Sequence, residues 1–98
     1  MDQGLSHVSD PAINRILLEH KSLLFAEQMK GAEALKYADM AIQRGANGVR
    51  AHYLRGRALA LVGELKKARK EMLHVLQLDP KNADGQRALA MIDNALAG

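Results

Sequence analysis

Apolar residues recur at intervals of three and four along most of the chain, which is the spacing that gathers side chains on one face of an α-helix. In the first such stretch Ile13, Leu17 and Leu24 share a face, and four further stretches of this kind follow it. Glycine, asparagine or Asp-Pro separates one stretch from the next. We therefore expect five helices, at about residues 11–29, 32–44, 50–62, 64–78 and 83–97.

The residues at the ends of these stretches support the same division. Asp10 can accept a backbone N–H as an N-cap, and Pro11 lacks an N–H that the first helical residue does not need. Glycine follows each of the first three stretches, at Gly31, Gly45 and Gly63, and supplies the left-handed conformation that commonly ends a helix.

The fourth stretch ends at Asp79-Pro80, because proline disfavours helical geometry in the residue before it, and Asn82 is a suitable N-cap for the fifth. The connections are short, so consecutive helices are expected to run antiparallel. Residues 1–10 contain few apolar side chains and are expected to form a flexible tail, which leaves 11–98 as a single domain.

The composition favours an all-helical protein. Among the 98 residues there are 16 alanines and 15 leucines, but only eight valines and isoleucines, and threonine is absent. Strand-forming side chains are therefore too scarce for a sheet. With 48% hydrophobic and 26% charged residues, the chain has the composition of an ordinary globular domain.

Two features of the chain recur at a distance of 34 residues. Ala34 and Ala68 are one such pair, and the breaks near Gly45 and Asp79-Pro80 are another. Direct identity between residues 15–48 and 49–82 is confined to four positions, so self-comparison alone is weak evidence for a repeat. A plain antiparallel bundle with accidental spacing remains an alternative at this point.

The residue types in 49–82 carry more information than the spacing. This segment resembles a tetratricopeptide repeat: Gly56 stands at the small position where two helices approach, Leu59 at a large core position, Ala68 at the small position opposite, and Asp79-Pro80 at the end of the repeat. The resemblance is fainter over 15–48, and 83–98 resembles the first helix of a further repeat. It implies a short right-handed superhelix of antiparallel helix-turn-helix units, with about two and a half repeats.

The resemblance also implies a binding surface. In tetratricopeptide proteins the first helices of successive repeats line a concave groove that holds a peptide or helix of a partner. Carried onto this sequence, the groove residues are Glu19, Leu23 and Glu27 from the first helix, Arg50, Tyr53, Leu54, Arg57 and Leu61 from the third, and Arg87, Met91 and Asn94 from the fifth. Arginine suits carboxylates, so we expect a peptide with acidic and apolar residues.

The distribution of charge leaves two further functions open. The net charge is +3, but residues 49–82 alone carry +5. A basic cluster in the fourth helix could bind RNA or another polyanion, although it lacks the interleaved aromatic residues that stack on bases; it comprises Lys66, Lys67, Arg69 and Lys70. A short repeat array could also self-assemble into a homo-oligomer through its apolar ends.

Nothing in the sequence indicates catalysis. Cysteine is absent, no glycine-rich phosphate loop occurs, and the four histidines are scattered without the spacing of a metal-binding helix. We therefore expect no enzyme activity, no cofactor and no metal. No signal peptide or apolar run long enough to span a bilayer is seen, so the expected location is the cytoplasm.

Overall fold

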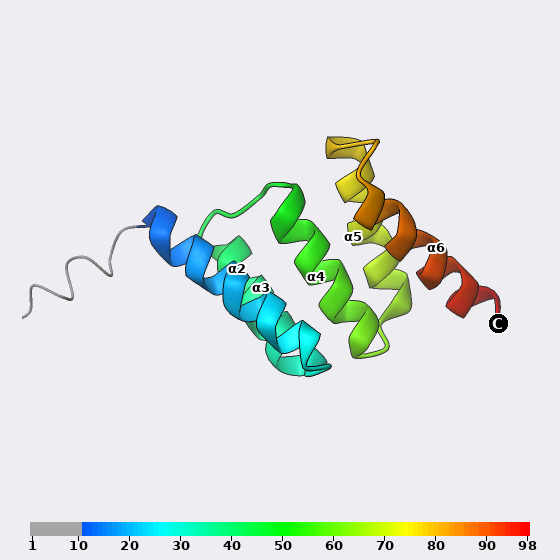
Figure 1. Cartoon of the computed structure of the whole chain (residues 1–98), viewed down its shortest axis with the longest axis horizontal. Coiled ribbons are helices and arrows are strands. Elements are labelled where there is room, and N and C mark those ends of the chain that lie inside the picture. Colours follow the sequence, from blue (N-terminus) through cyan, green and yellow to red (C-terminus); the bar gives the residue numbers. More distant parts are fainter. Residues whose placement is uncertain (1–10) are drawn as a thin grey trace, which may run out of the picture.

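The computed structural model describes residues 11–98, and within this range the chain is all-helical, as expected, without a strand. The helices are α2 (Pro11–Glu27), α3 (Gly31–Gln43), α4 (Val49–Leu61), α5 (Leu65–Leu78) and α6 (Ala83–Ala97) (Figure 1). Each end lies within two residues of the one expected from the sequence. The expected flexible tail, residues 1–10, and the expected cap Asp10 lie outside the described residues.

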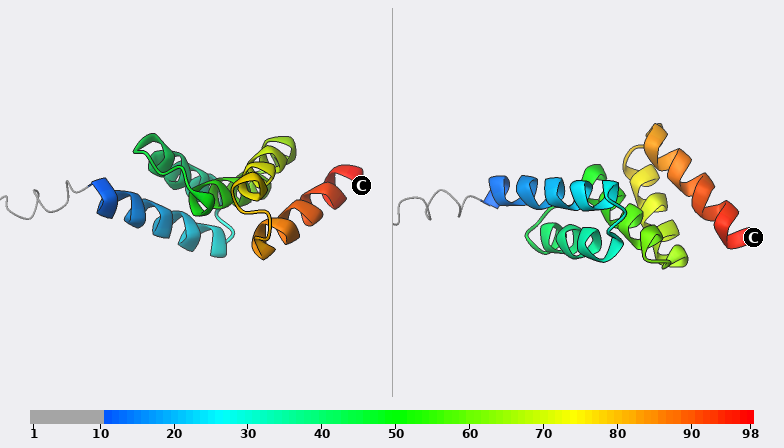
Figure 2. Two further views of the ribbon diagram at one scale, coloured as in Figure 1. Left: turned by 90° about the horizontal axis from the view of Figure 1, so that it is seen from above. Right: turned by 60° about the horizontal axis from the view of Figure 1, so that its bottom comes forward.

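The helices form two layers. Each helix packs against its neighbours along the chain, and α4 also contacts both α2 and α6. Viewed from above, α2 and α6 lie on one side of the molecule and α3 and α5 on the other (Figure 2, left). The hairpins α2–α3 and α4–α5 therefore stack side by side, α6 covers the end of the stack, and α4 lies between α2 and α6, which flank it in a repeat-like array.

The turns inside the two hairpins have the same hydrogen bonds, 34 residues apart. In the first turn the N–H of Lys30 donates to the carbonyl oxygen of Phe25 at 2.8 Å. In the second turn the N–H of Glu64 donates to the carbonyl oxygen of Leu59 at 2.9 Å. The N–H of Met29 also donates to the carbonyl oxygen of Ala26 at 3.0 Å, and the N–H of Gly63 donates to the carbonyl oxygen of Ala60 at 3.1 Å. The backbone therefore repeats more closely than the sequence does.

The expectation that Gly31 ends the first helix is wrong. Helix α2 ends at Glu27, and the left-handed residue of the turn is Met29, with φ 61°, where the second turn has Gly63 with φ 89°. Gly31 instead begins α3. A Cβ atom there would lie 2.8 Å from the Cβ of Leu61, so the glycine allows α3 to approach the end of α4 closely.

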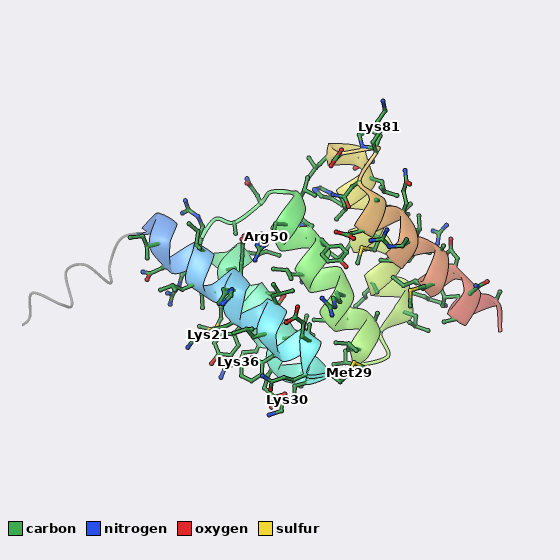
Figure 3. All side chains as sticks on the ribbon, viewed as in Figure 1. Lys21, Met29, Lys30, Lys36, Arg50 and Lys81 are labelled. Atoms are coloured by element: carbon green, nitrogen blue, oxygen red, sulfur yellow. The ribbon has the colours of Figure 1, made fainter. Side chains whose placement is uncertain are left out.

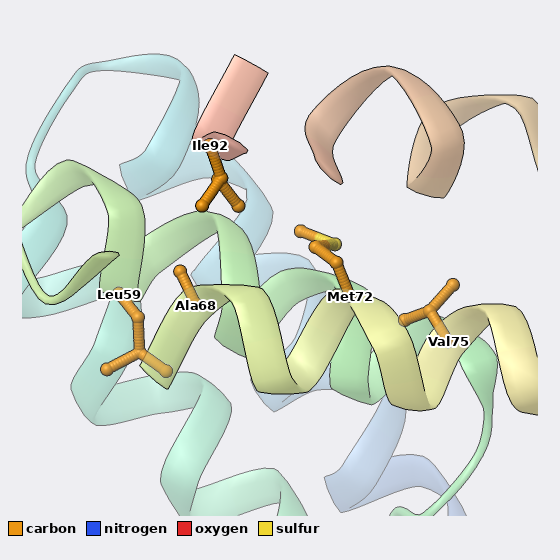
Figure 4. Close-up of a cluster of buried hydrophobic side chains, with 5 residues drawn as sticks. All are labelled: Leu59, Ala68, Met72, Val75 and Ile92. Atoms are coloured by element: carbon orange, nitrogen blue, oxygen red, sulfur yellow. The ribbon is translucent and has the colours of Figure 1, made fainter. Parts of the chain in front are cut away.

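The main core lies between α4, α5 and α6, where α5 directs three buried side chains toward the other two helices (Figure 4). Its buried members are Leu59, Ala68, Met72, Val75 and Ile92. Gly56 is buried beside them: a Cβ atom at this position would lie 2.9 Å from Cε of Met72 and 3.0 Å from Cβ of Glu71. The small residues expected at 56 and 68 thus stand at close contacts between helices.

A second core joins α2, α3 and α4 and consists mainly of alanine. Ala26, Ala34 and Ala58 are fully buried in it, which brings the three helix backbones close together. Ser22 is also fully buried, and its hydroxyl group donates to the carbonyl oxygen of Ala34 at 2.8 Å. This bond satisfies a polar group that would otherwise be costly to bury.

The start of α6 is capped as expected. The backbone N–H of Gly85 donates to Oδ1 of Asn82 at 2.7 Å, so the asparagine side chain satisfies one of the free donors of the first turn. The cap therefore stabilises the N-terminal end of α6, and Asp84 lies in the first turn of this helix.

Candidate functional site

Two adjoining hollows lie along α4, on the face that α2 and α6 flank. The first has a volume of about 500 Å³, and we name it the polar hollow; its lining is Leu23, Val49, Arg50, Tyr53, Leu54, Arg57, Asn82 and Asp84. The second has a volume of about 390 Å³, and we name it the apolar hollow; its lining is Met29, Tyr53, Arg57, Ala60, Leu61, Met72, Asp84, Arg87, Ala88, Met91 and Ile92. Tyr53, Arg57 and Asp84 line both, so the hollows form one continuous groove.

One side of the polar hollow is held by an ion pair between helices. Nε of Arg50 on α4 lies 3.2 Å from Oε1 of Glu19 on α2. The Glu19 side chain is 16% exposed and that of Arg50 is 56% exposed, so the acidic partner is largely buried and the basic one is not. The positive charge of Arg50 is therefore partly neutralised by Glu19.

The two arginines of the apolar hollow differ in their contacts. Arg87 is paired with Asp84, three residues earlier on α6. Arg57 makes no ion pair and no side-chain hydrogen bond with any residue in 11–98, although it is half-buried at the boundary of the two hollows. The Arg57 guanidinium group is thus a cation of the groove that the described chain leaves without a counter-ion.

Two of the large apolar side chains that line the apolar hollow are unusually exposed. Met29, in the turn between α2 and α3, is 73% exposed, and Met91 on α6 is 72% exposed. Leu61 of α4 and the buried Ile92 of α6 also line this hollow. An apolar surface of this kind, beside an unpaired cation, suits a ligand that carries both apolar and anionic groups.

Most of the residues expected in the groove lie together there, and some do not. The hollows are lined by Leu23, Arg50, Tyr53, Leu54, Arg57, Leu61, Arg87 and Met91. Glu19 joins them through its ion pair with Arg50, and Leu54 is 2% exposed, so it forms part of the floor. Glu27 and Asn94 line neither hollow.

Several residues that line the hollows were not predicted from the sequence, and Met29 and Asp84 are two of them. The signal for Met29 was present in the 34-residue repeat, because its counterpart in the second turn is Gly63. Met29 thus places a large apolar side chain where the second turn has none. Asp84 carried no comparable signal.

A second charged cluster joins α3, α4 and α5. Nε of Arg55 donates to Oδ1 of Asp39 at 2.6 Å, and a second guanidinium nitrogen donates to Oε2 of Glu71 at 2.5 Å. The hydrogen bond to Asp39, together with that to Glu71, raises the pKa of Arg55 above its ordinary value, against the opposing effect of burial. Oε1 of Glu71 also lies 2.8 Å from Nδ1 of His52, whose ring is 4.3 Å from that of His74. Two of the histidines that the sequence scatters are therefore neighbours.

We expect Arg55→Met to lower the free energy of unfolding by about 1–2 kcal/mol, because it leaves Asp39 and the largely buried Glu71 without their shared donor. Arg69→Met is the matched control: the Arg69–Asp93 pair is nearly half exposed on both sides, so its loss should cost less than about 1 kcal/mol. Urea unfolding of the two variants measures the difference. Equal losses would contradict the account of this cluster.

Three lysines and two aromatic rings form a further surface cluster on α2, α3 and the turn between them. The rings of Phe25 and Tyr37 are stacked, with centroids 5.5 Å apart. The ammonium groups of Lys21 and Lys36 lie 5.3 and 5.7 Å from the Tyr37 centroid, and that of Lys30 lies 5.9 Å from Phe25 (Figure 3). The lysines stack on rings of the protein itself, so these contacts stabilise the α2–α3 hairpin.

No protein-family model matches the chain, and no solved structure matches it. Between residues 11 and 98 no helix is both long enough and apolar enough to cross a bilayer. Nor does that part of the chain bring together three or more histidine, aspartate or glutamate side chains in an arrangement that could hold a metal ion.

Proposed function

We propose that the protein is a non-enzymatic interaction module of the tetratricopeptide type, which binds a peptide or helix of a partner protein in the groove between α2, α4 and α6. The observation that carries this proposal is Arg57: its half-buried guanidinium group lies between two hollows and has no partner in residues 11–98. A carboxylate of the ligand would pair with it in a partly desolvated site, where such a bond is stronger than on an open surface.

The repeated backbone supports the tetratricopeptide assignment. Matching hydrogen bonds join residues 25–30 and 59–64, and the small residues Gly56 and Ala68 stand at close helix contacts. In such arrays the first helices of successive repeats form one continuous surface. Here α2, α4 and α6 occupy that place, and the groove follows them.

The polyanion hypothesis has less support than the peptide hypothesis. Within its basic cluster Arg69 is already paired with Asp93 at 2.7 Å, so part of the positive charge is neutralised. The aromatic residues of the described chain, Phe25, Tyr37 and Tyr53, lie on α2, α3 and α4 rather than on α5. Base stacking beside Lys66, Lys67 and Lys70 therefore has no ring to use.

Selection from a random peptide library tests the proposal. We expect the wild-type protein to enrich peptides that combine acidic with large apolar residues, and we expect Arg57→Glu to lose this enrichment while keeping its fold. Enrichment of the same peptides by both proteins would place the contact elsewhere. If the wild-type protein enriches no peptide, the proposed function is rejected.

A second candidate function, self-association, is favoured by the outer face of α2. Leu17 and Leu24 are 50% and 42% exposed on this helix. Their counterparts 34 residues later are Ala51 and Ala58, which are buried among alanines of α3. On α4 this face packs against α3. The corresponding face of α2 bears larger apolar side chains, and no helix of residues 11–98 packs against it.

If a second copy covers this face, the wild-type protein should sediment as a concentration-dependent dimer. Leu24→Glu should then shift it to the monomer, because a charge would be buried in the interface. Leu73→Glu on α5, at a residue with 38% exposure, is the matched control and should leave the dimer intact. A wild-type monomer at every concentration measured would rule out self-association.

A further inference from the structure

We propose, on the basis of the proposed function, that the apolar hollow is the specificity subsite of the groove, in which Met29 and Met91 hold a long or aromatic side chain that adjoins an acidic group bound to Arg57. The ligand is thus a peptide with a bulky apolar residue next to aspartate or glutamate. Three observations support this, namely the conformation of Met29, the setting of Met91 and the charge of Arg57.

Met29 occupies a conformation that disfavours a side chain. Its φ is 61°, in the left-handed region, where a Cβ atom crowds the following carbonyl group. The second turn has the same hydrogen bonds with Gly63 in this place, so the turn itself does not need methionine. The Met29 side chain is 73% exposed, so the core does not need it either. What it does provide is part of the wall of the apolar hollow.

Met91 lines the same hollow from the opposite helix of the groove. It is 72% exposed on α6, whereas Ile92, the next residue, is buried in the core. Methionine is unbranched and polarisable, so two methionines can adjust to apolar side chains of different shape and make favourable contacts with aromatic rings. Exposed apolar side chains brought to one hollow from α6 and from the turn after α2 are a typical feature of a recognition surface.

The charges around the hollow determine the polar part of the ligand. Asp84 and Arg87 are paired with each other, so their charges are largely balanced. Arg57 is left with its positive charge at the edge of the apolar wall. An anionic group next to an apolar body complements this arrangement, and a cationic group does not.

A small-molecule probe tests the subsite without a peptide ligand. The probe is 4-phenylbutyrate, which joins an aromatic body to a carboxylate, and its control is 4-phenylbutylamine, which has the same body with an ammonium group. Both are titrated into protein with ¹³C-labelled methionine methyl groups. We expect millimolar binding of the carboxylate, with shifts at Met29 and Met91 and none at Met40.

A variant separates binding from folding. Met29→Gly removes the side chain and relieves the left-handed conformation, so it should raise the melting temperature by about 2–5 °C and weaken phenylbutyrate binding by about threefold or more. Leu73→Ala, at an exposed residue that lines neither hollow, is the control and should leave binding unchanged.

The results distinguish this inference from the function on which it rests. If the amine and the carboxylate shift the same signals equally, if neither shifts Met29 and Met91, or if Met29→Gly binds as wild type does, the subsite is wrong. Peptides enriched by the wild-type protein that lack an apolar residue beside the acidic one would also overturn it, while the proposed function would stand.

Discussion

Replacing Ala68 by leucine should lower the free energy of unfolding by about 1–3 kcal/mol, because there is no room for three more carbon atoms at this position. Ala68 is fully buried in the cluster that joins α4, α5 and α6, with Leu59, Met72 and Ile92 among its neighbours. A larger side chain must displace α5 from one of the helices that it joins. The destabilisation follows from overpacking and does not depend on the groove.

The same substitution at Ala95 is the matched control, since Ala95 is an exposed residue of α6. Leucine is a good helix former, so Ala95→Leu should change the free energy of unfolding by less than about 0.5 kcal/mol. Thermal unfolding distinguishes the two, because 1 kcal/mol corresponds to a shift of about 4–8 °C in a domain of this size. Equal melting temperatures would show that α4, α5 and α6 do not meet closely at Ala68.

Reversing the charge of Arg57 should weaken binding of an acidic peptide about tenfold or more while leaving the fold intact. In the wild-type protein we expect the guanidinium group to pair with a ligand carboxylate in a partly desolvated position. Arg57→Glu removes this pair and places two like charges next to each other. Arg57 has no partner among residues 11–98, so its loss should not destabilise the fold through a broken ion pair.

Lys66→Glu is the control for the change in net charge. It changes the charge of the protein by the same amount at an exposed position of α5, outside both hollows. Fluorescence anisotropy with a peptide enriched in the library selection gives both dissociation constants. If Lys66→Glu weakens binding as much as Arg57→Glu does, the interaction depends on net charge and not on the groove.

Much of the fold could be predicted from local chemistry. The spacing of apolar residues and the end signals predicted five helices, and Asn82 caps α6 as expected. The glycines between the predicted helices were a less reliable guide to where each helix ends. Gly31 was expected to end the first helix, but Met29 takes the left-handed conformation and Gly31 is needed where α3 meets Leu61. A turn glycine and a close-contact glycine look alike in a sequence, and only the packing of α3 on α4 separates them.

The candidate site could be predicted in part, through the resemblance to a repeat family. That resemblance assigned Tyr53 and Arg57 to the groove, and both line it. It could not show that Arg57 lacks a partner while Arg50 has Glu19, because this depends on distances between helices. The proximity of His52 and His74 was equally hidden, since it depends on how closely α4 and α5 approach.

The most direct test of the groove is a map of backbone amide shifts on binding of an enriched acidic peptide to isotope-labelled protein. We predict the largest shifts at Tyr53 and Arg57 on α4 and at Met91 on α6, three residues that line the groove. Shifts confined to the basic cluster on α5, around Lys66, Lys67 and Lys70, would contradict this prediction and would identify the protein as one that binds acidic ligands through another face.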